Sequence, residues 1–178
     1  MRTIGWALAL LLACAGSAAA ADLPLGAFYG KWQGSALSES QISSYFRLSS
    51  RDIGVEIRAA GEGFTLTWNT VLRQRGDPRS PTEELRSNTL TFVPARRPGL
   101  WVGQGNADPV QGGRPFFWAY VQDNTLVVQS LQVADDGGSE LQVYRRTLTG
   151  NGMELEFTRT LDGEAARRAK GRLIKLAN

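Results

Sequence analysis

The sequence predicts an all-β protein, an up-and-down antiparallel β-barrel of about eight to ten strands. Apolar and polar residues alternate along much of the chain, which places apolar side chains on one face of a strand. Short clusters of Gly, Asn and Asp separate the alternating runs, and these residues accept the positive φ of hairpin turns. A row of such strands protects its edges by closing into a barrel, and a flattened β-sandwich is the alternative.

Two runs show the alternation most clearly. Met153, Leu155 and Phe157 alternate with two glutamates, and Phe64–Leu72 repeats the pattern with Phe64, Leu66 and Trp68 on one side. Seven further runs rich in Val, Thr, Leu and aromatic residues are also expected to be strands: Tyr29–Leu37, Asp52–Ala59, Arg86–Val93, Phe116–Gln122, Thr125–Val133, Glu140–Thr149 and Ala166–Leu176. All seven prolines lie at or before Pro115, so the second half is expected to be an uninterrupted meander.

Three segments interrupt the strands of the first half. Gln74–Leu85 and Pro94–Pro115 are predicted to be long loops at a mouth of the barrel. Glu39–Phe46 fits either one or two helical turns capped by Ser38 or an irregular edge strand.

The first 21 residues are expected to be a secretory signal peptide. Arg2 precedes the apolar run Ile4–Ala15, and a small-residue segment ends at Ala21, where we expect cleavage. The run is shorter than the roughly 20 residues that a membrane-spanning helix needs. The alternative is a bacterial lipobox at Leu11–Cys14, in which Cys14 is the lipidated residue. Either outcome predicts a bacterial protein outside the cytoplasm, periplasmic or secreted or lipid-anchored, with residues 22–178 forming one barrel domain.

The composition excludes several kinds of chemistry. The 178 residues include no histidine, and Cys14 is the one cysteine. Without the signal peptide, the chain therefore cannot form a Ser-His-Asp or Cys-His catalytic arrangement. It also has no histidine or cysteine, the usual ligands of zinc, copper and haem. We expect no enzymatic activity, no metal and no cofactor, and stability without disulfides.

An apolar interior ringed by strands predicts a binding site for a small apolar or lipid-like ligand. The candidate walls are Trp68, Trp118 and Phe157, while the same residues would equally fill a solid core. Continuing the alternation from Met153 turns Arg159 inward, either as an anchor for a carboxylate or phosphate or at the rim. Trp101, in the second long loop, fits either a binding residue at the mouth or a plug folded back into the barrel.

Gly30-Lys31-Trp32 at the start of the first strand, with a basic last strand, resembles the Gly-x-Trp signature of lipocalins and the wider calycin group. The resemblance implies that Trp32 closes one end of the barrel. It also implies that a basic residue of the last strand, Arg172 or Lys170, packs across the indole ring. A cation over an indole face contributes about 0.5–2 kcal/mol.

The formal net charge is +3, with an excess of basic residues from Arg145 onward. This excess fits either contact with envelope or anionic lipids or a sheet edge protected by charge, and export disfavours nucleic acid as a partner.

Two functions follow as hypotheses. The first is a non-catalytic binding protein with a ligand inside the barrel. The second is an envelope-associated interaction or inhibitor module with a solid core.

Overall fold

The computed structural model describes residues 21–42, 48–73, 83–111 and 113–177. The predicted signal peptide, with Cys14, lies outside the described residues except for Ala21, as do most of the Gln74–Leu85 segment and residues 43–46 of the ambiguous one. The elements in chain order are η1 (Leu25–Phe28), β1 (Gly30–Ser40), β2 (Leu48–Ala60), β3 (Gly63–Arg73), β4 (Glu83–Pro94), β5 (Leu100–Gly103), β6 (Phe116–Gln122), β7 (Thr125–Val133), β8 (Ser139–Thr149), β9 (Gly152–Leu161) and β10 (Glu164–Lys175).

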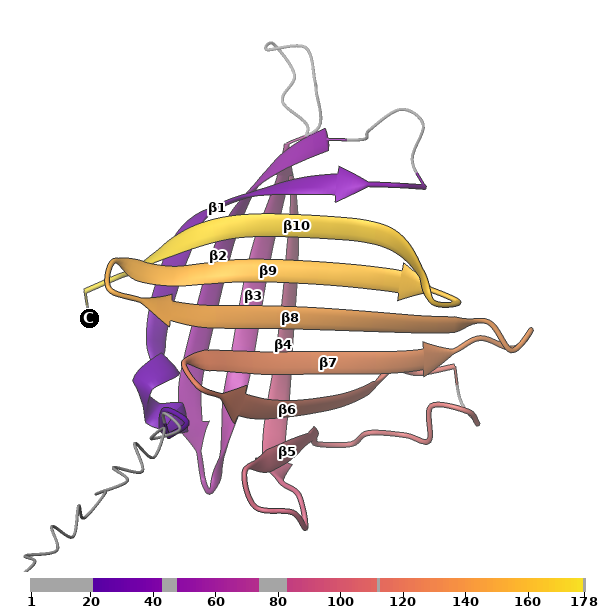
Figure 1. The fold of residues 1–178 in the computed structure, drawn as a ribbon, viewed down its shortest axis with the longest axis horizontal. Helices are drawn as coiled ribbons and strands as arrows, with labels where there is room; N and C mark the ends of the chain where they lie inside the picture. The colour runs from indigo at the N-terminus through magenta and orange to yellow at the C-terminus, as the bar shows by residue number, and fades with distance from the viewer. Residues whose placement is uncertain (1–20, 43–47, 74–82, 112, 178) are drawn as a thin grey trace, which may run out of the picture.

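The ten strands form one closed antiparallel barrel in the order β1-β10-β9-β8-β7-β6-β5-β4-β3-β2. The seam between β1 and β10 runs from Trp32 opposite Lys175 to Ser40 opposite Arg167, so the sheet has no free edge there. In Figure 1, β6 to β10 run across the front of the barrel, and β2 to β4 run behind and across them. The predicted fold class is confirmed, as a closed barrel and not a flattened sandwich.

The strand predictions differ from the structure mainly in one long loop. Phe116–Gln122 and Thr125–Val133 have the predicted bounds, whereas β5 lies inside the segment Pro94–Pro115 that was predicted to be a loop. Prolines and glycines surround the short Leu-Trp-Val run of β5, and they concealed a strand that pairs at only three register positions with β4 and three with β6. The first part of the Glu39–Phe46 segment is strand, since β1 continues to Ser40.

The apolar core fills the end of the barrel at which η1 lies, which we call the η1 end. Phe28, Ile57, Phe64, Leu66 and Phe92 are fully buried there. The rings of Phe64 and Phe92 stack with centroids 4.7 Å apart. Large side chains pack the η1 end and leave no room for solvent beside these residues.

The barrel closes tightly at Gly34, where β1 bends against β10. A Cβ at this position would overlap the carbonyl oxygen of Arg172, so Gly34→Ala is expected to destabilise the fold by about 1–3 kcal/mol or more. Gly54→Ala is the control, because its Cβ would meet nothing closer than the Asn69 Cβ at 3.8 Å. Urea unfolding of both variants checks this prediction, and equal midpoints for the two would contradict it.

Candidate functional site

The inside of the barrel differs between its two ends. At the η1 end, inward residues such as Ile57, Phe64 and Phe92 are fully buried, whereas several inward side chains toward the opposite end keep part of their surface exposed. Trp68, Tyr144, Phe157 and Arg159 point inward by strand register, and all four are only half-buried. Asn88, opposite Trp68, is exposed. Solvent therefore reaches the interior from the end opposite η1.

Three aromatic rings from three strands meet in this accessible half. The Tyr144 centroid lies 4.6 Å from that of Phe157 on β9 and 5.9 Å from that of Trp68 on β3. Trp68 and Phe157 are placed inside, as the alternation predicts. Sequence reasoning missed Tyr144, although the same alternation along Glu140–Thr149 assigns it to one face with Gln142 and Arg146. We call Trp68, Tyr144, Arg146, Phe157, Arg159 and Glu140 the inner site.

A polar network joins the aromatic residues to the accessible end. Arg159 Nη2 lies 2.5 Å from Glu140 Oε2, and Gln142 donates from its amide to the other oxygen of Glu140. The Tyr144 hydroxyl donates to Gln142 Oε1 at 2.8 Å. The hydrogen bond from Arg159 lowers the pKa of Glu140 against the opposing effect of burial, and the same bond raises the pKa of Arg159. Arg159 is thus an inward residue held by a carboxylate.

Arg146 is the most unusual residue of the interior. Its side chain is 1% exposed, and its Nε and Nη1 have no hydrogen-bond partner among the residues that the structure describes. Its guanidinium carbon lies 5.5 Å from the centroid of the Tyr144 ring, and burial lowers its pKa to about 10. Arg146 therefore remains a cation at neutral pH. The sequence concealed this residue, because Arg145 and Arg146 are adjacent and only the strand register shows which one points inward.

Further unpartnered donors lie closer to the accessible end. Ser40, Arg167 and Arg159 are register neighbours on β1, β10 and β9. The Ser40 hydroxyl and the Nε atoms of both arginines are buried without a hydrogen-bond partner in the described part of the chain. The interior therefore offers more positive charge and more donors than the Glu140 carboxylate satisfies.

Glu140→Gln is expected to lower stability at pH 7 by about 1.5–3 kcal/mol, since it removes a charged hydrogen bond. The depressed pKa of Glu140 means that this stabilisation is complete above the ordinary glutamate pKa of about 4.3 and is lost as pH falls further. Urea unfolding at pH 7 and pH 3 checks this expectation. The difference in the free energy of unfolding between wild type and Glu140→Gln should be smaller at pH 3 than at pH 7. An equal difference at both pH values would contradict the expectation. Glu156→Gln, which affects an exposed pair with Lys170, is the control and is expected to change little.

Two predicted tryptophans lie away from the inner site. Trp101 on β5 packs edge-on against Phe64, with centroids 5.8 Å apart, so it acts as a plug in the core. Trp118 points outward, because its neighbour Ala119 faces the core. Placing Trp118 in a ligand wall was wrong: the run Phe116–Val121 is apolar on both faces, so its alternation does not select the inner one.

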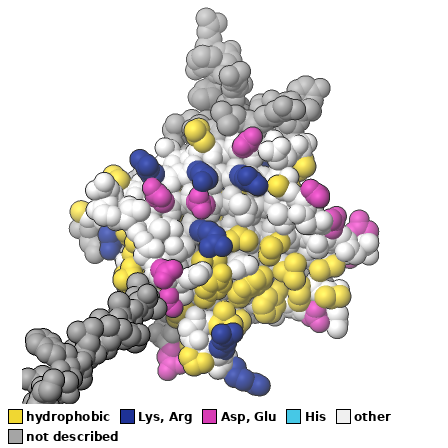
Figure 2. All heavy atoms as spheres, viewed as in Figure 1, with side chains coloured by type: hydrophobic (Ala, Val, Ile, Leu, Met, Phe, Trp, Pro, Cys, Tyr) yellow, Lys and Arg dark blue, Asp and Glu magenta, His cyan; other side chains and the backbone are white. Residues whose placement is uncertain are grey.

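Trp118 belongs to an apolar outer face on β6 to β8, where Figure 2 shows hydrophobic side chains gathered over these strands. The outward residues are half-buried, and they are Phe116, Trp118, Tyr120, Leu131, Val133, Leu141 and Val143. The rings of Phe116 and Trp118 lie 6.2 Å apart. We call this set the outer apolar face.

Trp32 closes the η1 end, and Lys175 lies across its ring with Nζ 5.2 Å from the centroid. The indole nitrogen donates to the Phe28 carbonyl at 3.0 Å. The expected partners were Arg172 or Lys170, and this expectation was wrong. Strand register places Lys175 opposite Trp32.

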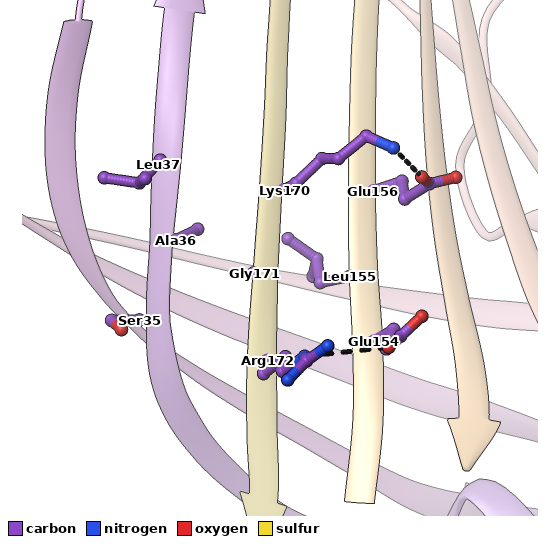
Figure 3. A pocket seen from close by; sticks show the side chains of 9 residues that line it. All are labelled: Ser35, Ala36, Leu37, Glu154, Leu155, Glu156, Lys170, Gly171 and Arg172. Atoms are coloured by element: carbon purple, nitrogen blue, oxygen red, sulfur yellow. Dashed lines mark ion pairs between the residues drawn. The ribbon is translucent and has the colours of Figure 1, made fainter.

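Arg172 and Lys170 instead point to the outside of the barrel. Figure 3 shows them paired with Glu154 and Glu156. These residues line a surface groove of about 470 Å³ over β1, β10 and β9. The groove is lined by charges that already satisfy one another, at 2.7 Å for Lys170 and Glu156 and 3.7 Å for Arg172 and Glu154.

Within the described ranges, no three or more His, Cys, Asp or Glu residues gather as metal ligands would. No helix in the described part of the chain is long and apolar enough to cross a membrane.

No protein-family model matches the sequence. No curated protein matches it at a significant level. Among solved structures, a protein of unknown function from the DUF3598 family of Nostoc punctiforme is similar with a TM-score of 0.56 and 14% identity, covering 87% of this chain and 50% of that one. This chain thus spans half the length of that structure, and the likeness concerns the barrel fold, which fits a calycin-like architecture. A 12:0-ACP thioesterase from Umbellularia californica aligns over 82% of this chain and 75% of that one, with 8% identity and a TM-score of 0.17, too low to indicate a shared fold.

Proposed function

We propose that the protein is an exported, non-catalytic binding protein that holds a small apolar ligand inside its barrel. One observation carries the proposal: Trp68, Tyr144 and Phe157 point inward yet keep solvent-accessible surface. Aromatic walls with a few convergent polar groups are typical of small-molecule sites. The packed η1 end supplies the floor of such a site, and the inner site supplies its walls.

Membership of the lipocalin group is part of this proposal. The Gly30-Lys31-Trp32 start and the cation over the Trp32 ring support it, as does the calycin-like barrel.

The lack of histidine in the chain supports a binding role without catalysis. The signal-like first 21 residues support export. Mass spectrometry of the protein from a bacterial envelope tests export: a chain starting at Asp22 or an acylated Cys14 supports it, and an uncleaved chain contradicts it.

Binding of N-phenyl-1-naphthylamine, a neutral apolar dye that fluoresces in apolar sites, tests ligand binding. We expect saturable binding near one dye per protein. Trp68→Leu should weaken it about tenfold or more, by the loss of an aromatic wall, and Trp118→Leu is the matched control on the outer face. Absent dye binding would overturn the proposal. So would dye binding that depends on Trp118 and not on Trp68, because the ligand would then lie outside the barrel.

The outer apolar face favours a second candidate function, contact with an anionic lipid surface. Its aromatic residues are bordered by exposed basic side chains, namely Arg96 and Arg97 before β5, Arg114 before β6 and Arg145 on β8. Apolar burial combined with basic residues is how peripheral proteins bind anionic membranes. Sedimentation with phosphatidylglycerol vesicles tests this. Trp118→Ser should reduce the bound fraction and Trp68→Leu should not, whereas absent sedimentation would contradict it.

A further inference from the structure

Arg146 is more deeply buried than the three aromatic residues of the inner site. In strand register Arg146 is opposite Leu126 on one side and Leu155 on the other, both of them buried apolar residues. Tyr144 and Phe157 occupy the next register position toward the accessible end. Arg146 thus faces the apolar interior of the barrel, with its Nε and Nη1 unpartnered.

Within the described part of the chain, no carboxylate pairs with this cation. Glu140, an inward carboxylate six residues away on the same strand, is bound by Arg159 and Gln142. The ring of Tyr144 contributes a cation–π contact, which does not supply an acceptor for the unpartnered Nε and Nη1. A buried cation without an anion is strongly unfavourable unless a counter-charge reaches it.

We infer that Arg146 binds the acid group of the ligand, and that the ligand is an apolar carboxylate. This inference rests on the proposed function, because the ligand enters the same accessible half. Arginine donors form short, strong hydrogen bonds to carboxylates, and the apolar surroundings strengthen them. The inward Arg167 lies toward the accessible end from this position, and its positive charge attracts an anion, whereas the charge of Arg159 is paired with Glu140.

The aromatic rings determine the shape of this ligand. Tyr144 contacts Phe157 on β9 and Trp68 on β3, and Tyr144 and Phe157 lie one inward register position from Arg146 toward the accessible end. Because the rings contact one another, the ligand lies alongside them and not between them, with its acid group toward Arg146. The apolar part of the ligand then lies against the rings.

Displacement of N-phenyl-1-naphthylamine by decanoate and by 1-decanol tests the inference. Decanoate is expected to bind wild type about 10- to 100-fold more tightly than decanol, the range that one charged hydrogen-bonded contact supplies. Arg146→Met should abolish this preference while the dye still binds. Arg145→Met, which removes the adjacent but exposed arginine, should retain it.

Each outcome separates the inference from the proposed function. Equal affinities for decanoate and decanol, or a preference that survives Arg146→Met, would overturn the role of Arg146 while dye binding still supports the proposed function. If no probe binds, the proposed function fails as well. If Arg146→Met does not fold, the ¹⁵Nε resonance of Arg146 in wild type decides: it should shift with decanoate and not with decanol, and an unchanged resonance with bound decanoate would overturn the inference.

Discussion

Arg146→Met is expected to stabilise the ligand-free protein by about 1–3 kcal/mol. The arginine is 1% exposed with two unpartnered nitrogens, so folding removes its charge from water without full compensation. Burial lowers the pKa of Arg146 to about 10, since its charged form loses hydration on folding. Methionine has a similar length and suits the neighbouring Leu126 and Leu155.

Urea unfolding of the ligand-free protein measures this effect through the midpoint at unchanged slope. Arg145→Met controls for the loss of one positive charge, because this side chain is exposed on the outer wall. A higher midpoint for Arg146→Met alone is the expected result. A lower midpoint would mean that the wild-type cation is compensated within the protein, and would remove the reason for a ligand carboxylate there.

Phe64→Ala is expected to have the largest effect on the free energy of unfolding, a loss of about 3–5 kcal/mol. Phe64 is fully buried, stacks on Phe92 at 4.7 Å and meets Trp101 edge-on at 5.8 Å. It thereby joins β3, β4 and β5, and β5 is the shortest strand of the barrel. Alanine would leave a cavity that these fixed strands cannot fill.

Phe116→Ala is the matched control, since Phe116 lies half-buried on the outer apolar face. We expect it to change stability by less than about 1 kcal/mol. Thermal and urea unfolding of the two variants give the comparison. A similar loss of unfolding free energy in Phe64→Ala and Phe116→Ala would contradict the assignment of the core to the η1 end.

The alternation of apolar and polar residues along the chain was sufficient to predict much of the barrel. The alternation in Met153–Phe157 and Phe64–Leu72 placed Phe157, Arg159 and Trp68 on the correct face, because their outward neighbours are polar. The hairpin turns then fixed the antiparallel order. β5 escaped because a strand of four residues among prolines and glycines carries too short a pattern to detect.

The inner site could be predicted only in part, for two physical reasons. Where both faces of a strand are apolar, as around Trp118, the alternation does not say which face is inside. Where two like residues are adjacent, as Arg145 and Arg146 are, composition does not say which one is buried. Lys175 illustrates a third reason: its contact with Trp32 depends on the register between the first and last strands, which distant segments of the sequence do not reveal.

The most direct test of ligand binding inside the barrel is a crystal structure of the protein grown with decanoate. The predicted result is a decanoate chain against Trp68 and Phe157, with its carboxylate about 2.7–2.9 Å from a nitrogen of Arg146. Decanoate bound on the outer apolar face beside Trp118, or in the groove between Arg172 and Glu154, with the interior filled by protein side chains alone, would contradict it.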